Sequence, residues 1–293
     1  MNANSNRKAD AEVSAAHSMK FVDISMDLHN HKSSAVQKLV LTQIGLIFLL
    51  FSVIDSSNHK KSSNYTFARP AAKMSINPIV ISSSVKQTAT VIFLHGLGDS
   101  GNGWAEAMTQ IRQPYMKVIC PSASPMPVSL NQGFRMPSWF DLFTLDESGP
   151  EDENGIKEAA KLVHSLIDRE IETSNVPSSR IALGGFSQGG ALALYSAFTY
   201  NKPLAGVMAL SCWIPLHKTF PAAAISNKDM PIVQCHGDCD PIVPLKWGQL
   251  TASILKSFAK NTELKTYRGL MHSSSDMELK DLKKFLETVL PPV

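Results

Sequence analysis

One pentapeptide, residues 185–189 with the pattern G-x-S-x-G, constrains the fold of this chain more than any other stretch of its sequence. It directly follows a strand-like run at 180–184 and opens an apolar, alanine-rich run at 190–198. Glycines two residues either side of a serine permit a strand-to-helix turn so sharp that the hydroxyl stands exposed above the edge of a sheet. Ser187 is therefore a predicted nucleophile. The pentapeptide by itself also fits a glycine-rich turn whose serine caps a helix, so the rest of the chain has to decide between the two.

Alternating strand and helix patterns predict the architecture around this turn. Strand-like runs begin near residues 89, 117, 181, 204, 231 and 263, and helical patterns begin near 103, 155, 188, 245 and 276. The segment 156–171 repeats apolar residues at helical spacing, with charged residues between them. With 44% hydrophobic and 18% charged residues, the chain can bury a core. The pattern indicates an α/β fold with a mostly parallel central sheet and helices on both faces.

A nucleophilic serine needs a histidine that takes its proton and a carboxylate that orients the histidine. In the architecture that the turn implies, the acid and then the base follow the serine along the chain, each after a later strand. Of nine histidines, only His217, His236 and His272 lie beyond Ser187. His272 is the predicted base, because it alone follows both a strand and an acidic loop.

Two aspartates compete for the role of the acid. The short apolar strand 231–236 runs into a loop that contains Asp238 and Asp240. Asp240 is the predicted acid, because it lies deeper in the loop and Pro241 stiffens the backbone after it. Asp238 could instead accept hydrogen bonds from amides of the turn.

The same chemistry needs two backbone N–H groups aimed at the oxyanion that forms when a carbonyl is attacked. Gln188, the residue after the nucleophile, is predicted to supply one of them. Leu97 is the predicted second donor, since it lies in the glycine-rich stretch 95–101 after the strand-like run 89–94. The plainer alternative is a strand-ending turn followed by a helix cap at Asp99.

Five blocks of this sequence resemble one known family, the acyl-protein thioesterases, which are also called lysophospholipase-like carboxylesterases. The blocks occur in order at residues 93–99, 136–141, 184–190, 210–213 and 235–241, within a likeness that runs from about residue 75 to the C-terminus. The resemblance implies an α/β-hydrolase whose nucleophile, acid and base are Ser187, Asp240 and His272, with Leu97 and Gln188 as the oxyanion donors.

The same resemblance implies hydrolysis of thioesters between long acyl chains and protein cysteines, that is, protein depalmitoylation. S-acylated proteins, lysophospholipids and the membrane surface are the expected partners. A lysophospholipase or general carboxylesterase that acts on oxygen esters is the first alternative, because the same catalytic residues cleave both bonds. A non-catalytic acyl-binding protein with a hydrolase fold is the second, although such proteins have usually lost a catalytic residue. The oligomeric state is left open.

The segment 121–145 is rich in proline, methionine and aromatic residues and shows no clear period. A long apolar loop of this kind is usually functional. It fits a groove for an acyl chain and equally fits ordinary core packing, and the resemblance favours the groove. The predicted acyl-binding residues are Leu130, Phe134, Met136 and Trp139.

Four cysteines lie in or beside the predicted core strands, at spacings that match no disulfide framework. Reduced thiols in a cytosolic enzyme fit them best. Cys235, His236 and Cys239 have a permissible metal spacing, but no second ligand pair accompanies them, so no metal site is predicted. No cofactor is implied, and no phosphate loop or basic stripe supports nucleic-acid binding.

Residues 1–73 form a predicted N-terminal extension, largely disordered, ahead of a hydrolase domain at 74–293. The extension has nine basic and five acidic residues, against 19 and 20 in the remainder, so the basic excess belongs to it. Its uncharged run 39–54 has 16 residues, fewer than the roughly 20 that span a bilayer. A membrane anchor and a signal-peptide core both fit this run. Because free cysteines argue against secretion, the expected location is cytoplasmic and peripheral to membranes, with possible anchoring through 39–54.

Overall fold

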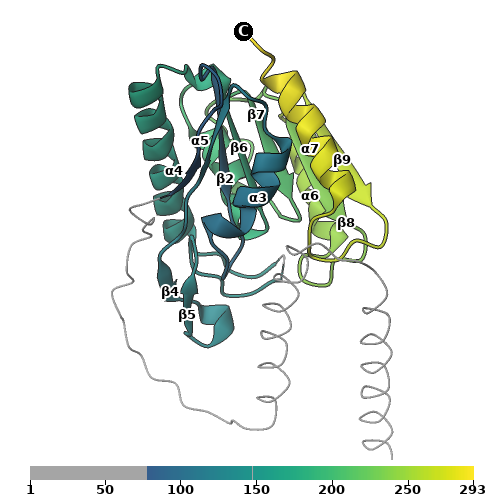
Figure 1. Cartoon of the computed structure of the whole chain (residues 1–293). Coiled ribbons are helices and arrows are strands. Elements are labelled where there is room, and N and C mark those ends of the chain that lie inside the picture. The colour runs from purple at the N-terminus through teal and green to yellow at the C-terminus, as the bar shows by residue number, and fades with distance from the viewer. Residues whose placement is uncertain (1–77, 147) are drawn as a thin grey trace, which may run out of the picture. The chain divides into compact units, whose positions relative to one another are not determined.

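A twisted seven-stranded sheet lies at the centre of the computed structural model, which describes residues 78–146 and 148–293 (Figure 1). Its order is β1-β3-β2-β6-β7-β8-β9, and every neighbouring pair is parallel except β1 with β3. The prediction of a mostly parallel sheet is therefore confirmed. The strands are β1 (Ile79–Ile81), β2 (Ala89–Leu94), β3 (Met116–Cys120), β6 (Ile181–Phe186), β7 (Gly206–Leu210), β8 (Ile232–Gly237) and β9 (Thr262–Tyr267).

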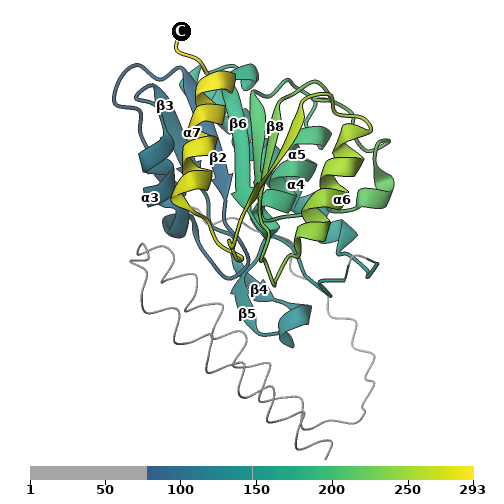
Figure 2. The ribbon, with the colours of Figure 1, turned by 90° about the vertical axis from the view of Figure 1, so that its right-hand side faces the viewer.

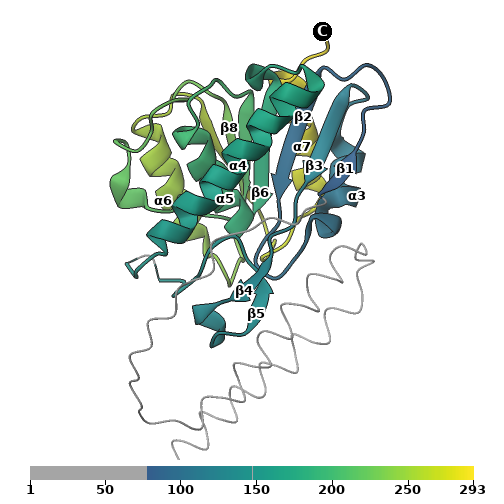
Figure 3. The ribbon, with the colours of Figure 1, turned by 90° about the vertical axis from the view of Figure 1, so that its left-hand side faces the viewer.

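Helices cover both faces of this sheet, as Figures 2 and 3 show from opposite sides. They are α3 (Gly101–Ile111), α4 (Glu153–Ser174), α5 (Gln188–Thr199), α6 (Leu245–Lys256) and α7 (Asp276–Val289). Successive residues of the central strands point to opposite faces of the sheet and pack against the helices on those faces. Val91 and Phe93 belong to the core under α3 and α7, whereas Ile92 and Leu94 belong to the core under α4, α5 and α6. The near-continuous apolar strands thus reflect burial on both faces.

Helix α4 shows how the helical pattern translates into packing. Its apolar positions from Ile156 to Ile167 are buried against the sheet side, as the spacing predicts. Asp152 caps its first turn by accepting a hydrogen bond from the Gly155 amide. Glu170 is also buried, because its carboxylate accepts a hydrogen bond from Thr90 and binds the Lys117 ammonium at 2.6 Å. Periodicity could not reveal that contact.

The segment 121–145 differs from the irregular loop that its composition suggests. It contains a two-stranded antiparallel sheet, β4 (Pro125–Pro127) and β5 (Arg135–Pro137), joined through a 3-10 turn at Ser129–Asn131. Prolines at the strand ends and strands of only three residues leave no alternation to detect. This hairpin projects beyond the sheet in all three ribbon views.

The predicted extension 1–73, its boundary with the hydrolase domain and the apolar run 39–54 lie outside the described residues. Within the part that the structure describes, no helix is both long and apolar enough to cross a membrane. All four cysteines of the chain are free, and only Cys239 is exposed.

Candidate active site

Each predicted catalytic residue follows the carboxyl end of a parallel strand. Ser187 comes directly after β6, Asp240 after β8, and His272 after β9. Leu97 follows β2, and Gln188 begins α5. Because parallel strands place their carboxyl ends at the same edge of a sheet, the fold brings these five positions to one edge.

Ser187 has a backbone conformation that side-chain-bearing residues rarely adopt, with φ 53° and ψ −121°. The flanking glycines make this turn possible. A Cβ at Gly185 would lie 2.4 Å from the carbonyl carbon of Gly189, and one at Gly189 would lie 2.2 Å from the Leu94 oxygen. Ser187 occupies the N-cap position of α5, yet its side chain makes no capping hydrogen bond. The geometry is that of a strained strand-to-helix turn, and the simple capping alternative has no support in it.

His272 is paired with Asp240 through a hydrogen bond of 2.7 Å from Nδ1 to Oδ2. The other carboxylate oxygen, Oδ1, accepts hydrogen bonds from the backbone N–H groups of Ile242 and Val243, both at 2.9 Å. Asp238 instead accepts a hydrogen bond from the Gly269 amide at 2.6 Å. Of the two competing aspartates, Asp240 therefore reaches the histidine, and Asp238 satisfies an amide of a neighbouring turn.

Phe186 links the histidine to the serine turn. Its ring packs on the His272 imidazole with a centroid separation of 4.7 Å, and it immediately precedes Ser187. Ser187, Asp240 and His272 are all nearly buried, with at most 9% of each residue exposed.

The loop after β2 passes directly over the serine turn. A Cβ at Gly96 would lie 3.5 Å from Ser187 Cβ and 3.2 Å from the Phe186 ring. Gly98 adopts a φ of +78° and donates its N–H to the Pro137 oxygen at 2.8 Å. The backbone of Leu97 lies between these two glycines and thus borders the turn that carries Gln188. Gln188 is the first residue of α5, where backbone N–H groups have no partner within the helix.

His95 braces this loop, a role that the sequence did not reveal. Its Nε2 accepts a hydrogen bond from the Ala123 N–H at 2.9 Å, and its Nδ1 lies 2.6 Å from the Gly96 oxygen. Because Nε2 accepts, the proton must lie on Nδ1, which donates to that oxygen. Burial lowers the pKa of His95 from 6.5 to about 4, so the ring is neutral. The Trp139 indole adds a further bond, from Nε1 to the His95 oxygen at 2.8 Å.

The four predicted acyl-binding residues occupy different environments. Trp139 is 1% exposed and held by that bond to His95, whereas Phe134 is 60% exposed. Leu130 is partly buried against the core under α4, and the Met136 sulfur borders Gly98. Their role as acyl contacts stays a prediction.

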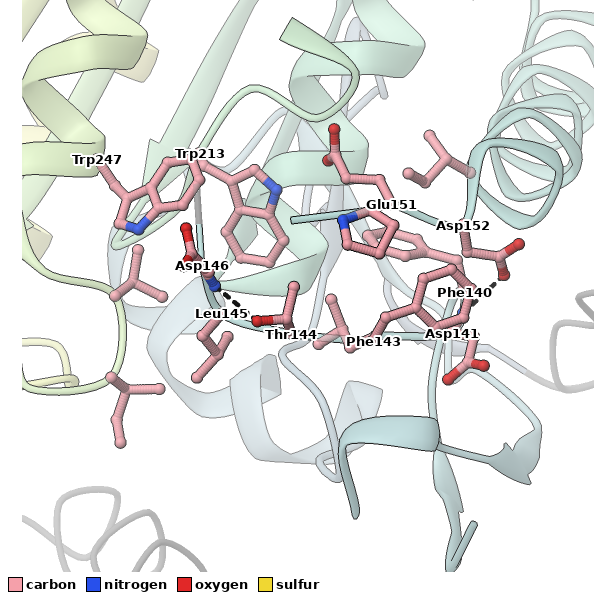
Figure 4. Close-up of a pocket in the computed structure, with 15 residues that line it drawn as sticks. Phe140, Asp141, Phe143, Thr144, Leu145, Asp146, Glu151, Asp152, Trp213 and Trp247 are labelled. Atoms are coloured by element: carbon pink, nitrogen blue, oxygen red, sulfur yellow. Dashed lines mark hydrogen bonds between the residues drawn. The ribbon is translucent and has the colours of Figure 1, made fainter. Parts of the chain in front are cut away.

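A pocket with about 510 Å³ of empty space, part of it open solvent, is lined in part by Ile242, two residues after Asp240. Figure 4 shows its wall. Its wall is formed by a segment at 140–146, a second at 150–156, and side chains that follow β7 and β8. Trp213 and Trp247 lie together on one side of it, and Phe143 lies farther along the wall. Val243 also lines the pocket, and its N–H binds Asp240, so the cavity and the acid share one residue.

Glu151 is one of four carboxylates in this wall, with Asp141, Asp146 and Asp152. Its Oε2 accepts a hydrogen bond from the Leu216 N–H at 2.8 Å. Burial is the main influence on its pKa and raises it. None of the four predicted acyl-binding residues lines this pocket; the sequence signal that could have found it is the pair of tryptophans after two successive strands.

Cys235, His236 and Cys239 do not converge as metal ligands would. The Cys235 sulfur lies 3.4 Å from the Tyr267 hydroxyl, His236 binds a backbone oxygen, and Cys239 is exposed. Among residues 78–146 and 148–293, no group of three or more histidine, cysteine or acidic side chains is arranged to hold a metal ion.

Comparison with known proteins identifies relatives of the whole described region. The sequence profile of a phospholipase/carboxylesterase family matches residues 76–290. Acyl-protein thioesterase 1 of Gibberella zeae is 42% identical over 229 residues, which cover 74% of this chain and 97% of that protein. Acyl-protein thioesterase 1 homolog 1 of Dictyostelium discoideum is 43% identical over 208 residues, or 70% of this chain and 92% of that protein.

Solved structures show the same fold. Acyl-protein thioesterase 2 of Zea mays is 32% identical, with a TM-score of 0.67, over 73% of this chain and 99% of that one. SOBER1 of Arabidopsis thaliana is 36% identical, with a TM-score of 0.63, over 69% of this chain and 99% of that one.

Proposed function

This chain belongs to the phospholipase/carboxylesterase family, and from that premise we propose that it is a serine hydrolase that removes long acyl chains from protein cysteines. Its curated relatives are named acyl-protein thioesterases and are more than 40% identical over most of their length. The single observation that carries the proposal is the 2.7 Å bond between His272 and Asp240, beside a serine held in a strained turn.

In the proposed reaction, Ser187 Oγ attacks the thioester carbonyl while His272 Nε2 takes its proton. Asp240 holds the proton of His272 on Nδ1, which leaves the lone pair of Nε2 to act as the base. The backbone N–H groups of Leu97 and Gln188 stabilise the oxyanion of the tetrahedral intermediate. The carbon–sulfur bond then breaks, and the imidazolium of His272 returns its proton to the departing cysteine sulfur.

Water completes the cycle. His272 takes a proton from a water molecule, whose oxygen attacks the acyl-serine ester. The bond to Ser187 Oγ breaks, the serine regains a proton from His272, and the fatty acid leaves. The net reaction converts a thioester and water into a carboxylic acid and a thiol.

We place the acyl chain in the pocket beside Asp240. The pocket is concave and partly open to solvent, as sites for small molecules are. Its wall is mainly apolar, including Phe143, Trp213 and Trp247, and an apolar wall suits a hydrocarbon chain. Leu130, Phe134, Met136 and Trp139 remain predicted acyl contacts, of which Met136 and Trp139 border the oxyanion loop.

Hydrolysis of a palmitoyl-cysteine peptide and of lysophosphatidylcholine, measured side by side with the full chain, tests the proposal. Ser187→Ala is expected to lower kcat at least about 10⁴-fold on both substrates, because it removes the nucleophile. Ser196→Ala is the matched control, since it deletes a buried hydroxyl of α5, the helix that Ser187 precedes, and this hydroxyl has no hydrogen-bond partner among the residues that the structure describes. A faster reaction with the lysolipid would assign the function to lysophospholipid turnover by the same mechanism.

A fluorophosphonate probe separates the enzyme from a non-catalytic acyl-binding protein. Wild type and Ser196→Ala are expected to be labelled, and Ser187→Ala is not, because only an activated serine reacts with the probe. A folded wild-type protein that resists labelling would contradict the proposed mechanism and favour an acyl-binding role.

A further inference from the structure

His236 is a buried histidine that the proposed reaction does not use. It is the fifth residue of β8, its neighbours in the strand are buried, and only 1% of it is exposed. On the face under α6, the ring packs directly against the helix backbone. A Cβ at Gly248 would lie 2.6 Å from His236 Nδ1, so only glycine allows this approach. The imidazole is therefore fixed between a strand and a helix.

The hydrogen bond of His236 defines its protonation. Nε2 lies 2.7 Å from the backbone oxygen of Val243, and a carbonyl oxygen can only accept. Nε2 therefore carries the proton. Burial is the main influence on the pKa of His236 and lowers it, which favours the neutral ring.

Val243 connects this ring to the acid. Its carbonyl oxygen accepts from His236, and its N–H donates to Asp240 Oδ1 at 2.9 Å. His236 Nε2 also lies 3.7 Å from Asp240 Oδ2, the oxygen that binds His272. The His236 side chain thus holds the loop between β8 and α6 through the Val243 backbone. The same loop directs the Asp240 carboxylate to His272.

We infer that His236 is a positioning residue that holds the Asp240 carboxylate in register with His272 by fixing Val243. This inference rests on the proposed function, because it assigns His236 a role in orienting the acid of that mechanism. Without the imidazole, the buried Val243 carbonyl would lose its partner and the loop could turn. Asp240 would then keep its charge but lose the fixed direction in which it meets Nδ1 of His272.

Kinetics of the full chain with a soluble p-nitrophenyl ester test the inference. His236→Phe keeps a ring but has no donor, and we expect kcat to fall between about 10- and 100-fold with KM nearly unchanged, as for other partners that orient a functional side chain. His236→Gln can still donate to the Val243 oxygen and is expected to recover most of the loss. His164→Phe is the matched control, because it removes a similar bond, 2.9 Å from a ring nitrogen to the Ser196 oxygen, between α4 and α5.

Proton NMR supplies a readout that a merely structural role would not change. The His272 Nδ1 proton, held by Asp240, is expected to give a low-field resonance in wild type and in His164→Phe. In His236→Phe the resonance should shift or broaden by exchange, and in His236→Gln it should return. If His236→Phe does not fold, His236→Asn replaces it, since its shorter amide cannot reach the Val243 oxygen and the same loss of kcat is expected.

Wild-type kcat and an unmoved resonance in a folded His236→Phe or His236→Asn would overturn the inference. An equal loss of kcat in His236→Gln, without recovery of the resonance, would also overturn it. The proposed function fails separately, when Ser187→Ala retains activity. Activity that depends on Ser187 but not on His236 would contradict only the positioning role.

Discussion

Two loops contribute to the candidate site beside the serine turn, one after β2 and one after β8, and a buried histidine braces each of them. His95 holds the first loop through two backbone partners, Gly96 and Ala123, and touches no carboxylate in its hydrogen-bond set. His236 holds the second through one backbone partner and also faces Asp240 at 3.7 Å. The groups that His95 contacts are thus neutral backbone dipoles, whereas His236 faces a carboxylate. We therefore expect kcat to depend on the geometry of the loop after β2 and on the charge held by the loop after β8.

Asp240→Asn gives the largest expected change and tests the charge on the second loop. The amide keeps the shape of the side chain but presents an N–H₂ group or an uncharged oxygen to His272. We expect kcat to fall about 10⁴-fold, because the imidazole would adopt the wrong tautomer and lose its partner charge. Steady-state hydrolysis of a p-nitrophenyl ester measures this loss.

Asp238→Asn is the control for that substitution, since it makes the same change two residues away in the same loop. Asp238 is exposed and accepts a hydrogen bond from a turn amide, at Gly269. Its kcat should stay within about twofold of wild type, as expected for surface substitutions. A comparable loss in both variants would mean that the loop, and not the charge of Asp240, sets the rate.

His95→Asn tests the geometry of the first loop. The shorter side chain can still donate to the Gly96 oxygen but leaves the buried Ala123 N–H without an acceptor. We expect kcat to fall about 10- to 100-fold, since complete loss of one oxyanion donor costs about 10²–10³. The pH dependence of kcat should keep its wild-type midpoint, because no charged group has changed; a displaced midpoint would place His95 in the electrostatics of the site.

The same variant should also change how stability responds to acid. Wild-type His95 has a pKa near 4 when folded and 6.5 when unfolded, so the unfolded chain alone takes up a proton between these values. The contribution of neutral His95 to the free energy of unfolding is complete above pH 6.5. It decreases by roughly 3 kcal/mol as the pH falls towards 4. Thermal unfolding at pH 7 and pH 4.5 should show a smaller drop in Tm for His95→Asn than for wild type.

Trp213→Ala sharpens the comparison by asking what the pocket on the acid side selects. Removing the indole takes away apolar surface on which an acyl chain would be buried, and such burial stabilises by roughly 25 cal/mol per Å². We therefore expect kcat/KM for a palmitoyl thioester to fall about tenfold relative to kcat/KM for a butyryl thioester. Phe134→Ala, at the exposed hairpin, is expected to change that ratio less. The opposite ranking would place the acyl chain along β4 and β5.

Glu278→Gln should leave kcat within about twofold and affect only stability. Glu278 lies in the first turn of α7, is fully buried, and neither carboxylate oxygen has a hydrogen-bond partner in the described part of the chain. Burial raises its pKa from 4.5 to about 8. The folded state therefore keeps the proton while the unfolded state releases it, and wild type loses stability as the pH rises from about 4.5 to about 8.

Thermal unfolding at pH 5 and pH 8 checks this pH dependence of stability, which is opposite in sign to that expected for His95. The Tm advantage of Glu278→Gln over wild type should grow with pH, because the amide never needs to lose a proton. Glu106→Gln, on an exposed position of α3, should show no such trend. A constant difference between the two pH values would mean that Glu278 is not protonated in the folded state.

Local patterns predicted much of this molecule. The glycines around Ser187, the chain order of acid and base, and the alternation of strands with helices depend on neighbouring residues, and the corresponding strands and helices begin where those patterns place them or within two residues. Chain order also singled out His272, whose partner the structure identifies as Asp240.

The rest depends on contacts between distant residues. The bracing roles of His95 and His236 have no local signal, because they depend on backbone partners such as Ala123, which is distant in the sequence. The pocket combines segment 140–146 with Trp213 and Trp247 from elsewhere in the chain, so the predicted groove segment 121–145 contains only part of its wall. Glu278 stands where a helix-capping glutamate is common, and nothing local indicates that α7 buries it.

Gln188 couples properties that an engineer would wish to separate. Its backbone begins α5 beside the reactive serine, while its side chain accepts from the Trp139 N–H at 3.1 Å and donates to the Phe140 oxygen at 2.8 Å. Phe140 in turn begins the wall of the pocket. A library that varies this position would therefore alter the rate of the chemistry and the preference for chain length together. Redesign of the pocket should start from residues such as Trp247, which make no hydrogen bond to Gln188 in the described part of the chain.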